Sequence, residues 1–147
     1  MTKPEHITYQ VLFVCVENSC RSQMAEAIFN HLAEIERLNI RAVSAGTRPS
    51  DRINPSAIKV LRETGIDVGY QKPKPLTQEV IAQSDKIVTM GCLAKDICPA
   101  AFLPKTEDWR VEDPAGKSIE KFRDVRDIIR DRVERLFSEV TPSIRDE

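Results

Sequence analysis

The sequence predicts an α/β fold, a single doubly wound domain in which helices flank a four-stranded parallel sheet. Three observations lead to this prediction. Apolar, β-branched runs alternate with segments of helical periodicity, a pattern typical of a parallel sheet covered on both faces. The 147 residues suffice for one domain with a substantial core. The sequence contains neither repeats nor low-complexity segments, so we treat residues 1–147 as one unit.

Four short segments rich in apolar and β-branched residues predict the strands of the sheet. Such residues favour extended backbone, and glycine after them is typical of a turn. Gly46 closes the second segment in this way. We place the strands at residues 9–14, 41–44, 86–90 and 109–111.

The first two helices are predicted from periodicity and capping residues. The first covers residues 22–38, and its apolar residues recur every three or four positions on one face. These residues are Met24, Ile28, Leu32 and Ile35. The second helix has Asn54 as its N-cap and Pro55 at its first position, and it ends at Gly65.

Two further helices complete the pattern. A short one over residues 77–83 follows a stiff Lys-Pro-Lys-Pro segment. The last helix begins at Ser118 and turns five apolar residues toward the core. They are Phe122, Val125, Ile129, Val133 and Leu136.

The junction between the first strand and the first helix carries the strongest chemical signal. The strand leads into Cys15, a short polar loop follows, and Arg21 opens the helix. Such a loop aims unpaired backbone N–H groups at one point, where the helix dipole also favours an anion. The planar fork of an arginine holds two oxygens of a phosphate-like group, and a thiolate is a good nucleophile. We therefore predict a cradle for a tetrahedral oxyanion, with Cys15 attacking it.

The residues that form this cradle can be named from the sequence. Ser22 is placed to hydrogen-bond the sulfur of Cys15, and Asn18 to pin the loop from within. The loop residues are Val16, Glu17, Asn18, Ser19, Cys20 and Ser22. The alternative at this point is a buried core thiol at a strand end, with Arg21 as a solvated helix residue.

Composition and charge narrow the possible functions. The 22 basic residues nearly balance the 23 acidic residues, so there is no bulk positive field to attract nucleic acid. The longest apolar run, residues 11–16, is far too short to span a membrane. No charged and then apolar leader precedes it, so we expect a cytoplasmic protein. In that compartment four cysteines are more often catalytic or metal-binding than disulfide-bonded.

Two competing cysteine chemistries fit less well. A zinc site built from all four cysteines would need closer pairs than Cys15 with Cys20 and Cys92 with Cys98. Neither of the two histidines is placed to activate a cysteine, which disfavours a papain-like hydrolase.

Several segments together resemble a known family. Residues 15–26 are similar to the phosphate-binding loop of the low-molecular-weight protein tyrosine phosphatases and of the thioredoxin-coupled arsenate reductases that share their fold. The resemblance covers about residues 8–137. Its other parts are the second strand and turn (43–47), the redox segment (88–92, then Cys98 and Pro99), the acid loop (109–117) and the last helix (125–127).

The resemblance to the arsenate reductases implies a low-molecular-weight phosphatase-like fold and a relay of thiols. Cys15 would attack arsenate, Cys92 would attack the sulfur–arsenic adduct, and Cys98 would take over the disulfide. Asp113 would protonate the departing oxygen. Cys20 is expected to be a spectator or protective thiol.

The same resemblance implies what the chain would bind. Phosphate or sulfate would bind as analogues of arsenate. We expect no bound cofactor or metal and a monomer. The reductant would be thioredoxin, or alternatively glutaredoxin or glutathione.

Two alternatives stay open. A phosphatase would need only Cys15, Arg21 and Asp113, and an oxyanion- or partner-binding module would need the loop alone. The phosphatases carry a tyrosine pair after their Asp-Pro-Ala, where this chain has Gly116 and Lys117. That difference favours a small inorganic oxyanion over phosphotyrosine.

Two positions depart from the pattern of the family. Glu17 stands where glycine is common, and we expect its side chain to face solvent, away from the anion. Some arsenate reductases bind potassium beside the loop through residues that match Asn18, Glu26 and Ser44, together with an acidic residue. This chain lacks that carboxylate, and we expect the ammonium group of Lys74 to take the place of the cation.

Overall fold

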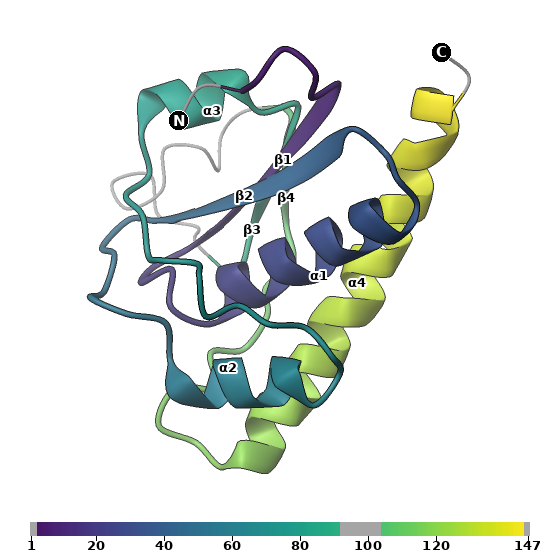
Figure 1. The fold of residues 1–147 in the computed structure, drawn as a ribbon. Coiled ribbons are helices and arrows are strands. Elements are labelled where there is room, and N and C mark those ends of the chain that lie inside the picture. Colours follow the sequence, from purple (N-terminus) through teal and green to yellow (C-terminus); the bar gives the residue numbers. More distant parts are fainter. Residues whose placement is uncertain (1–2, 92–103, 146–147) are drawn as a thin grey trace.

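The computed structural model describes residues 3–91 and 104–145, with side chains up to residue 142. Four strands and four helices alternate over most of this length (Figure 1). The strands are β1 (Tyr9–Cys15), β2 (Ile40–Gly46), β3 (Lys86–Thr89) and β4 (Thr106–Asp108). The helices are α1 (Arg21–Ile35), α2 (Pro55–Arg62), α3 (Gln78–Gln83) and α4 (Ile119–Arg145). Every helix within these described ranges is too short or too polar to cross a membrane.

The strands form one parallel sheet in the order β2-β1-β3-β4, which confirms the predicted architecture. Chain order and spatial order diverge at β1, because β2 lies on one side of it and β3 on the other. Ligands of open α/β sheets bind at such a switch point, beyond the carboxyl ends of the strands. The carboxyl ends meet at one edge of the sheet, where the last strand residues are Cys15, Gly46, Thr89 and Asp108.

Both faces of β1 are buried, and its residues alternate between two cores. Val11 and Phe13 belong to the larger core, which contains residues of α1, α2 and α4. Leu12 and Val14 belong to a smaller core beneath α3. Figure 1 shows α1, α2 and α4 together on one side of the sheet, with α3 apart from them. Cys15 therefore ends a strand that is fixed from both sides.

The prediction of the fourth strand was wrong. It was placed at residues 109–111, but β4 covers Thr106–Asp108 and the chain leaves the extended conformation directly afterwards. Trp109 still donates a backbone hydrogen bond to Thr89 (2.8 Å), but Arg110 has φ of 50°, in the left-handed region. The apolar Trp109 and Val111 are buried, as a strand would bury them, and this misled the prediction.

The predicted helices are all present, although some of their ends differ by a few residues. Asn54 caps α2 by accepting a hydrogen bond from Ser56 N (2.9 Å), as predicted. The five apolar residues predicted to point inward from α4 are all buried. The inward position of Ile35 was wrong, because 63% of this residue is exposed. It is the last residue of α1, where the helix has already left the core.

Glu63, directly after α2, joins this helix to α4. Both of its carboxylate oxygens accept hydrogen bonds from Arg123, and Oε1 also accepts one from Arg126 Nη1 (2.9 Å). Arg126 Nη1 additionally donates to the carbonyl of Val60 (2.8 Å). The hydrogen bonds from Arg123, with a further contribution from Arg126, lower the pKa of Glu63 to about 2.

We expect Glu63→Gln to lower stability at neutral pH, and we expect the difference from the native chain to depend on pH. A carboxyl whose pKa is depressed on folding stabilises the fold above its ordinary pKa of 4.5 and loses that effect as pH falls toward 2. Urea unfolding at pH 7, 4 and 2.5 should show the two stability curves converging. Glu5→Gln, an exposed glutamate far from α2 in sequence, is the control and should follow the native curve. A constant difference at all three pH values would contradict the prediction.

Candidate active site

Cys15 lies at the switch point of the sheet and is almost completely buried, with 4% of its surface exposed. Its strand partner in β2 is Gly46, and a side chain there would clash with the loop that follows Cys15. A Cβ atom added to Gly46 would lie 2.7 Å from the carbonyl oxygen of Val16 and 2.9 Å from Cβ of Asn18. The absence of a side chain at Gly46 thus lets the loop pack against the end of β2.

The loop after Cys15 turns its carbonyl groups outward, toward residues 47–54. Four of its carbonyl oxygens accept backbone hydrogen bonds from that segment, at N···O distances of 2.8–3.3 Å. The pairs are Cys15 with Thr47, Val16 with Arg48, Glu17 with Ser50 and Ser19 with Asn54. Because the peptide bonds are trans, the N–H group that follows each carbonyl points the opposite way. Those N–H groups donate to no acceptor within the described residues, so they are available to an anion.

The N-terminus of α1 adds further free donors. The helix begins at Arg21, and the preceding Cys20 provides no side-chain cap. The first N–H groups of a helix have no partner inside it, and they carry the positive end of its dipole. The loop and α1 together therefore form a concave set of backbone donors, as predicted.

Asn18 pins the loop from within, also as predicted. It is fully buried and adopts a φ of 52°, in the left-handed region that asparagine tolerates better than most residues. Its Oδ1 accepts hydrogen bonds from the backbone N–H of Lys74 (2.9 Å) and from Nε2 of Gln23 (3.0 Å). The backbone donor fixes the orientation of the amide, so Nδ2 is the atom that donates to Ser22 Oγ (2.7 Å).

This orientation leaves the proton of the Ser22 hydroxyl available to the sulfur. Ser22 Oγ lies 2.8 Å from Cys15 Sγ, the contact that the sequence predicted. The hydroxyl already accepts a hydrogen bond from Asn18, so its own O–H can point at the sulfur. A chain of hydrogen bonds thus runs from Lys74 N to Asn18 Oδ1 and from Asn18 Nδ2 to Ser22 Oγ, and it places the Ser22 hydroxyl where it can donate to a thiolate at Cys15.

Arg21 reaches across the carboxyl edge of the sheet. Its Nη1 donates to two carbonyl oxygens, those of Met90 (2.6 Å) and Val111 (2.8 Å). Its Nη2 lies 3.7 Å from Oδ2 of Asp113. Nε has no hydrogen-bond acceptor within the described residues, and neither does Nη2, so this side of the guanidinium is available for two oxygens of a ligand.

The structure places Asp113 beside Arg21, at the outer end of the guanidinium. About half of its side chain is exposed (49%), and its Oδ1 accepts a hydrogen bond from Ala115 N (3.0 Å). The acid loop predicted from the sequence therefore meets the cradle through the Arg21–Asp113 contact.

Glu17 and Cys20 occupy contrasting positions in the loop. Glu17 is exposed, as expected, so its carboxylate does not compete with an anion. Cys20 is buried, with 4% of its surface exposed. Burial raises the pKa of the Cys20 thiol, and the nearby Cys15 and Asp113 raise it further. Cys20 is therefore a protonated thiol at neutral pH and a poor nucleophile.

Glu26, Ser44 and Lys74 meet behind the loop, where the family resemblance placed them. Ser44 Oγ donates to Glu26 Oε1 (2.7 Å), and Lys74 Nζ lies 3.6 Å from the same oxygen. Burial raises the pKa of the Glu26 carboxyl, whereas Lys74 and Ser44 act in the opposite direction. A potassium ion does not fit the residues present, because the ammonium group of Lys74 already faces the carboxylate.

Two buried glutamines were missed by the sequence analysis. Gln23 Nε2 donates to the carbonyls of Asn18 and Lys72 (both 3.0 Å), and Gln71 Nε2 donates to Gln23 Oε1. These side chains tie the loop, α1 and residues 71–72 together. Nothing in the sequence indicated this role, because Gln71 and Lys72 lie 48 and 49 residues from Gln23.

Cys92 and Cys98 lie outside the described residues. Within residues 3–91 and 104–145, no group of three His, Cys, Asp or Glu side chains is placed to hold a metal ion.

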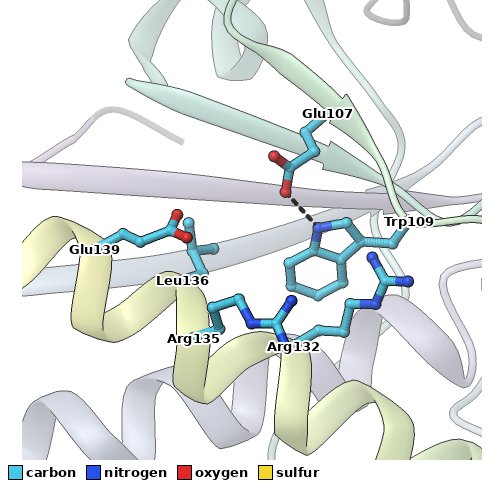
Figure 2. A pocket seen from close by; sticks show the side chains of 6 residues that line it. All are labelled: Glu107, Trp109, Arg132, Arg135, Leu136 and Glu139. Carbon is cyan, nitrogen blue, oxygen red and sulfur yellow. Dashed lines mark hydrogen bonds between the residues drawn. The ribbon is translucent and has the colours of Figure 1, made fainter.

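A cavity between the edge strand β4 and the second half of α4 lies apart from the cradle (Figure 2). Its volume is about 200 Å³. Its lining residues are Glu107, Trp109, Arg132, Arg135, Leu136 and Glu139. The charges of two arginines and two glutamates balance, and the lining contains no nucleophile, so this cavity does not compete with Cys15 as a catalytic site.

Comparisons with known proteins agree with this geometry. A family model described as low molecular weight phosphotyrosine protein phosphatase matches residues 10–145. A curated glutaredoxin arsenate reductase from Synechocystis is 35% identical over 133 residues, which cover 90% of this chain and 98% of that protein.

Solved structures of proteins with two different activities are similar to this chain. An arsenate reductase in the phosphate binding state has a TM-score of 0.79 and 35% identity, covering 90% of this chain and 99% of its own. A YwlE arginine phosphatase mutant with a phosphorylated active-site serine has a TM-score of 0.83 and 30% identity. The match covers 94% of this chain and 99% of that protein.

We expect Asn18→Ala to destabilise the chain by about 2–4 kcal/mol, since it strains the backbone and leaves the N–H of Lys74 without its acceptor. Asn18→Gly removes the same hydrogen bonds but adopts the positive φ without strain. It should therefore be about 1 kcal/mol more stable than the alanine variant. Urea unfolding of both variants tests this, and equal stabilities would contradict the assigned backbone strain.

Proposed function

Because the chain belongs to the low molecular weight phosphotyrosine protein phosphatase family, we propose that it is an arsenate reductase with Cys15 as its nucleophile. The observation that carries the choice of substrate is the similarity to a curated arsenate reductase over 90% of this chain. The geometry around Cys15 supports the choice of nucleophile. A buried sulfur faces a hydroxyl donor at the base of a loop with free N–H groups.

In the first step, the Cys15 thiolate forms a bond to arsenic, and one arsenate oxygen departs as water. Loop amides and the free side of Arg21 hold the remaining oxygens, which carry the charge that develops during the attack. Asp113 supplies the proton that the departing oxygen needs, in keeping with its position beside Arg21.

Two electrons then have to pass from sulfur to arsenic. A second thiolate, Cys92, attacks the sulfur of Cys15, and the electron pair of the sulfur–arsenic bond stays on arsenic, which leaves as arsenite. Cys98 then attacks Cys92 and releases Cys15 as a thiolate. An external thiol donor of the thioredoxin type, or glutaredoxin, reduces the resulting Cys92–Cys98 disulfide. Cys20 takes no part, in keeping with its raised pKa.

We also propose that Lys74 acts as a built-in cation behind the loop. Its ammonium group faces the buried Glu26, which accepts a hydrogen bond from Ser44. The backbone N–H of Lys74 donates a hydrogen bond to Asn18. Lys74 therefore has two roles: its ammonium group compensates the charge of Glu26, and its backbone holds the loop in shape. A buried carboxylate is costly unless a cation or hydrogen bonds compensate its charge.

The relay is tested by arsenate-dependent NADPH oxidation with a thioredoxin or glutaredoxin system. Hydrolysis of p-nitrophenyl phosphate is measured in parallel. We expect Cys92→Ser and Cys98→Ser each to reduce arsenate turnover by more than about 100-fold while residual phosphatase activity persists. Cys20→Ser is the matched control and should keep its arsenate turnover.

Each other outcome of this experiment has a definite meaning. Normal arsenate reduction in both variants would exclude the relay. Efficient phosphate release without arsenate turnover in the native chain would favour a phosphatase, the activity of the structurally similar YwlE arginine phosphatase. Phosphate binding without any turnover would indicate a binding module.

The role of Lys74 predicts how potassium affects the rate. The native chain should show no potassium activation, whereas Lys74→Asp supplies a carboxylate and should become dependent on added potassium. Steady-state arsenate reduction in sodium and potassium buffers of equal ionic strength measures this. Lys72→Asp, two residues away, is the control and should stay insensitive. Strong potassium activation of the native chain would exclude the proposal.

A further inference from the structure

We propose that Asp108 is the positioning residue for Arg21, and that it sets the affinity of the cradle for an oxyanion. The inference rests on the proposed function only in that Arg21 holds the oxyanion. It is tested by binding, independently of arsenate reduction.

The orientation of Arg21 depends on two carbonyl groups from different segments. Nη1 bonds to Met90, which follows β3, and to Val111, which lies beyond β4. A guanidinium is planar and rigid, so these two bonds determine where Nε and Nη2 point. Any change in the distance between the two carbonyls would rotate the free side of the guanidinium relative to Cys15.

One carboxylate oxygen joins the two segments. Oδ1 of Asp108 accepts hydrogen bonds from Thr89 Oγ1 (3.0 Å), Gly91 N (2.8 Å) and Arg110 N (3.2 Å). Thr89 and Gly91 stand on either side of Met90, and Arg110 directly precedes Val111. Asp108 thus fixes the backbone at both carbonyls that hold Arg21.

The backbone at these donors needs such support. Gly91 has φ of 107°, and Arg110 has φ of 50° although it is neither glycine nor asparagine. A non-glycine residue in the left-handed region costs about 1–2 kcal/mol, so surrounding contacts have to hold it. The side chain of Arg110 is largely exposed (78%) and provides little packing, which leaves its N–H bond to Asp108 as the local constraint.

Asp108 itself is placed for this task. Only 17% of its side chain is exposed, and its second oxygen, Oδ2, is buried without a hydrogen bond among the described residues. Among the described residues, Arg110 Nε lies 3.7 Å from that oxygen. A buried oxygen that accepts no hydrogen bond from the described residues is costly, so the three bonds of the other oxygen are what this carboxylate contributes here.

Asp85 offers a matched control at the opposite edge of the sheet. Its Oδ2 accepts a hydrogen bond from the backbone N–H of Gln10 (2.8 Å) and from Lys3 Nζ (3.3 Å). Like Asp108, Asp85 uses its carboxylate to hold the backbone of a strand. It does so at the amino end of β1, away from Arg21. Asp85→Ala therefore tests the effect of losing a similar carboxylate without moving the guanidinium.

The test measures the affinity of the reduced chain for inorganic phosphate by calorimetry, and the protection of Cys15 by phosphate against alkylation. We expect Asp108→Ala to weaken phosphate binding about tenfold. Asp108→Asn keeps the acceptor oxygen and should stay within about threefold of the native affinity. Asp85→Ala should bind phosphate as the native chain does, even where it lowers thermal stability.

A double-mutant cycle with Arg21→Lys separates positioning from general stability. Lysine cannot hold both carbonyls, so in this background Asp108→Ala should cause no further loss of phosphate affinity. Where Asp108→Ala does not fold, Thr89→Val removes one of the three donors and should weaken binding about two- to threefold, again only when Arg21 is present.

Three results would overturn the proposal. They are unchanged or tighter phosphate binding in folded Asp108→Ala, the same loss in the Arg21→Lys background as in the native chain, and an equal loss in Asp85→Ala. If phosphate binding changes as expected but the native chain does not reduce arsenate, the result would count against the proposed function and not against the role of Asp108.

Discussion

The cradle depends on one constraint, that the backbone N–H groups of the loop find no acceptor among the described residues of an otherwise well-bonded chain. Such groups are normally satisfied by neighbouring carbonyls, and a loop that keeps them free has to place its own carbonyls elsewhere. Residues 47–54 accomplish this by donating to four successive or nearly successive loop carbonyls. Gly46 makes the close approach possible, since a side chain there would meet the carbonyl of Val16.

Side chains hold this backbone shape with polar contacts that are nearly all buried. Asn18 joins the loop to Lys74, to Gln23 and, through Ser22, to the sulfur. None of these contacts uses a carboxylate facing the ligand. Negative charge is kept behind the loop at Glu26, where Lys74 lies close to it, and Glu17 is turned to solvent. Apart from Asp113, whose carboxylate lies 3.7 Å from Nη2 of Arg21, the described groups that face the cradle are hydrogen-bond donors and positive charge.

The sequence predicted the parts of the site that are local and missed those that depend on distant contacts. The strand, the loop and the helix around Cys15 follow one another in the chain, so residue type and order were sufficient for Ser22 and Asn18. The contact of Lys74 with Glu26 was expected only from resemblance to a family with a cation at that place. Residues 109–111 were mistaken for a strand, because buried apolar side chains do not reveal the positive φ of Arg110. The groups that accept the hydrogen bonds of Arg21 are backbone carbonyls, which no side-chain pattern encodes.

The distances along the chain between these partners have a consequence for biosynthesis. The carbonyls that hold Arg21 lie 69 and 90 residues beyond it, so they leave a ribosome long after Cys15 does. A nascent or truncated chain can therefore carry the sulfur and the start of α1 without the anchors that aim the guanidinium. On the proposed role of Arg21, the finished chain should therefore bind an oxyanion more tightly than fragments that already contain Cys15.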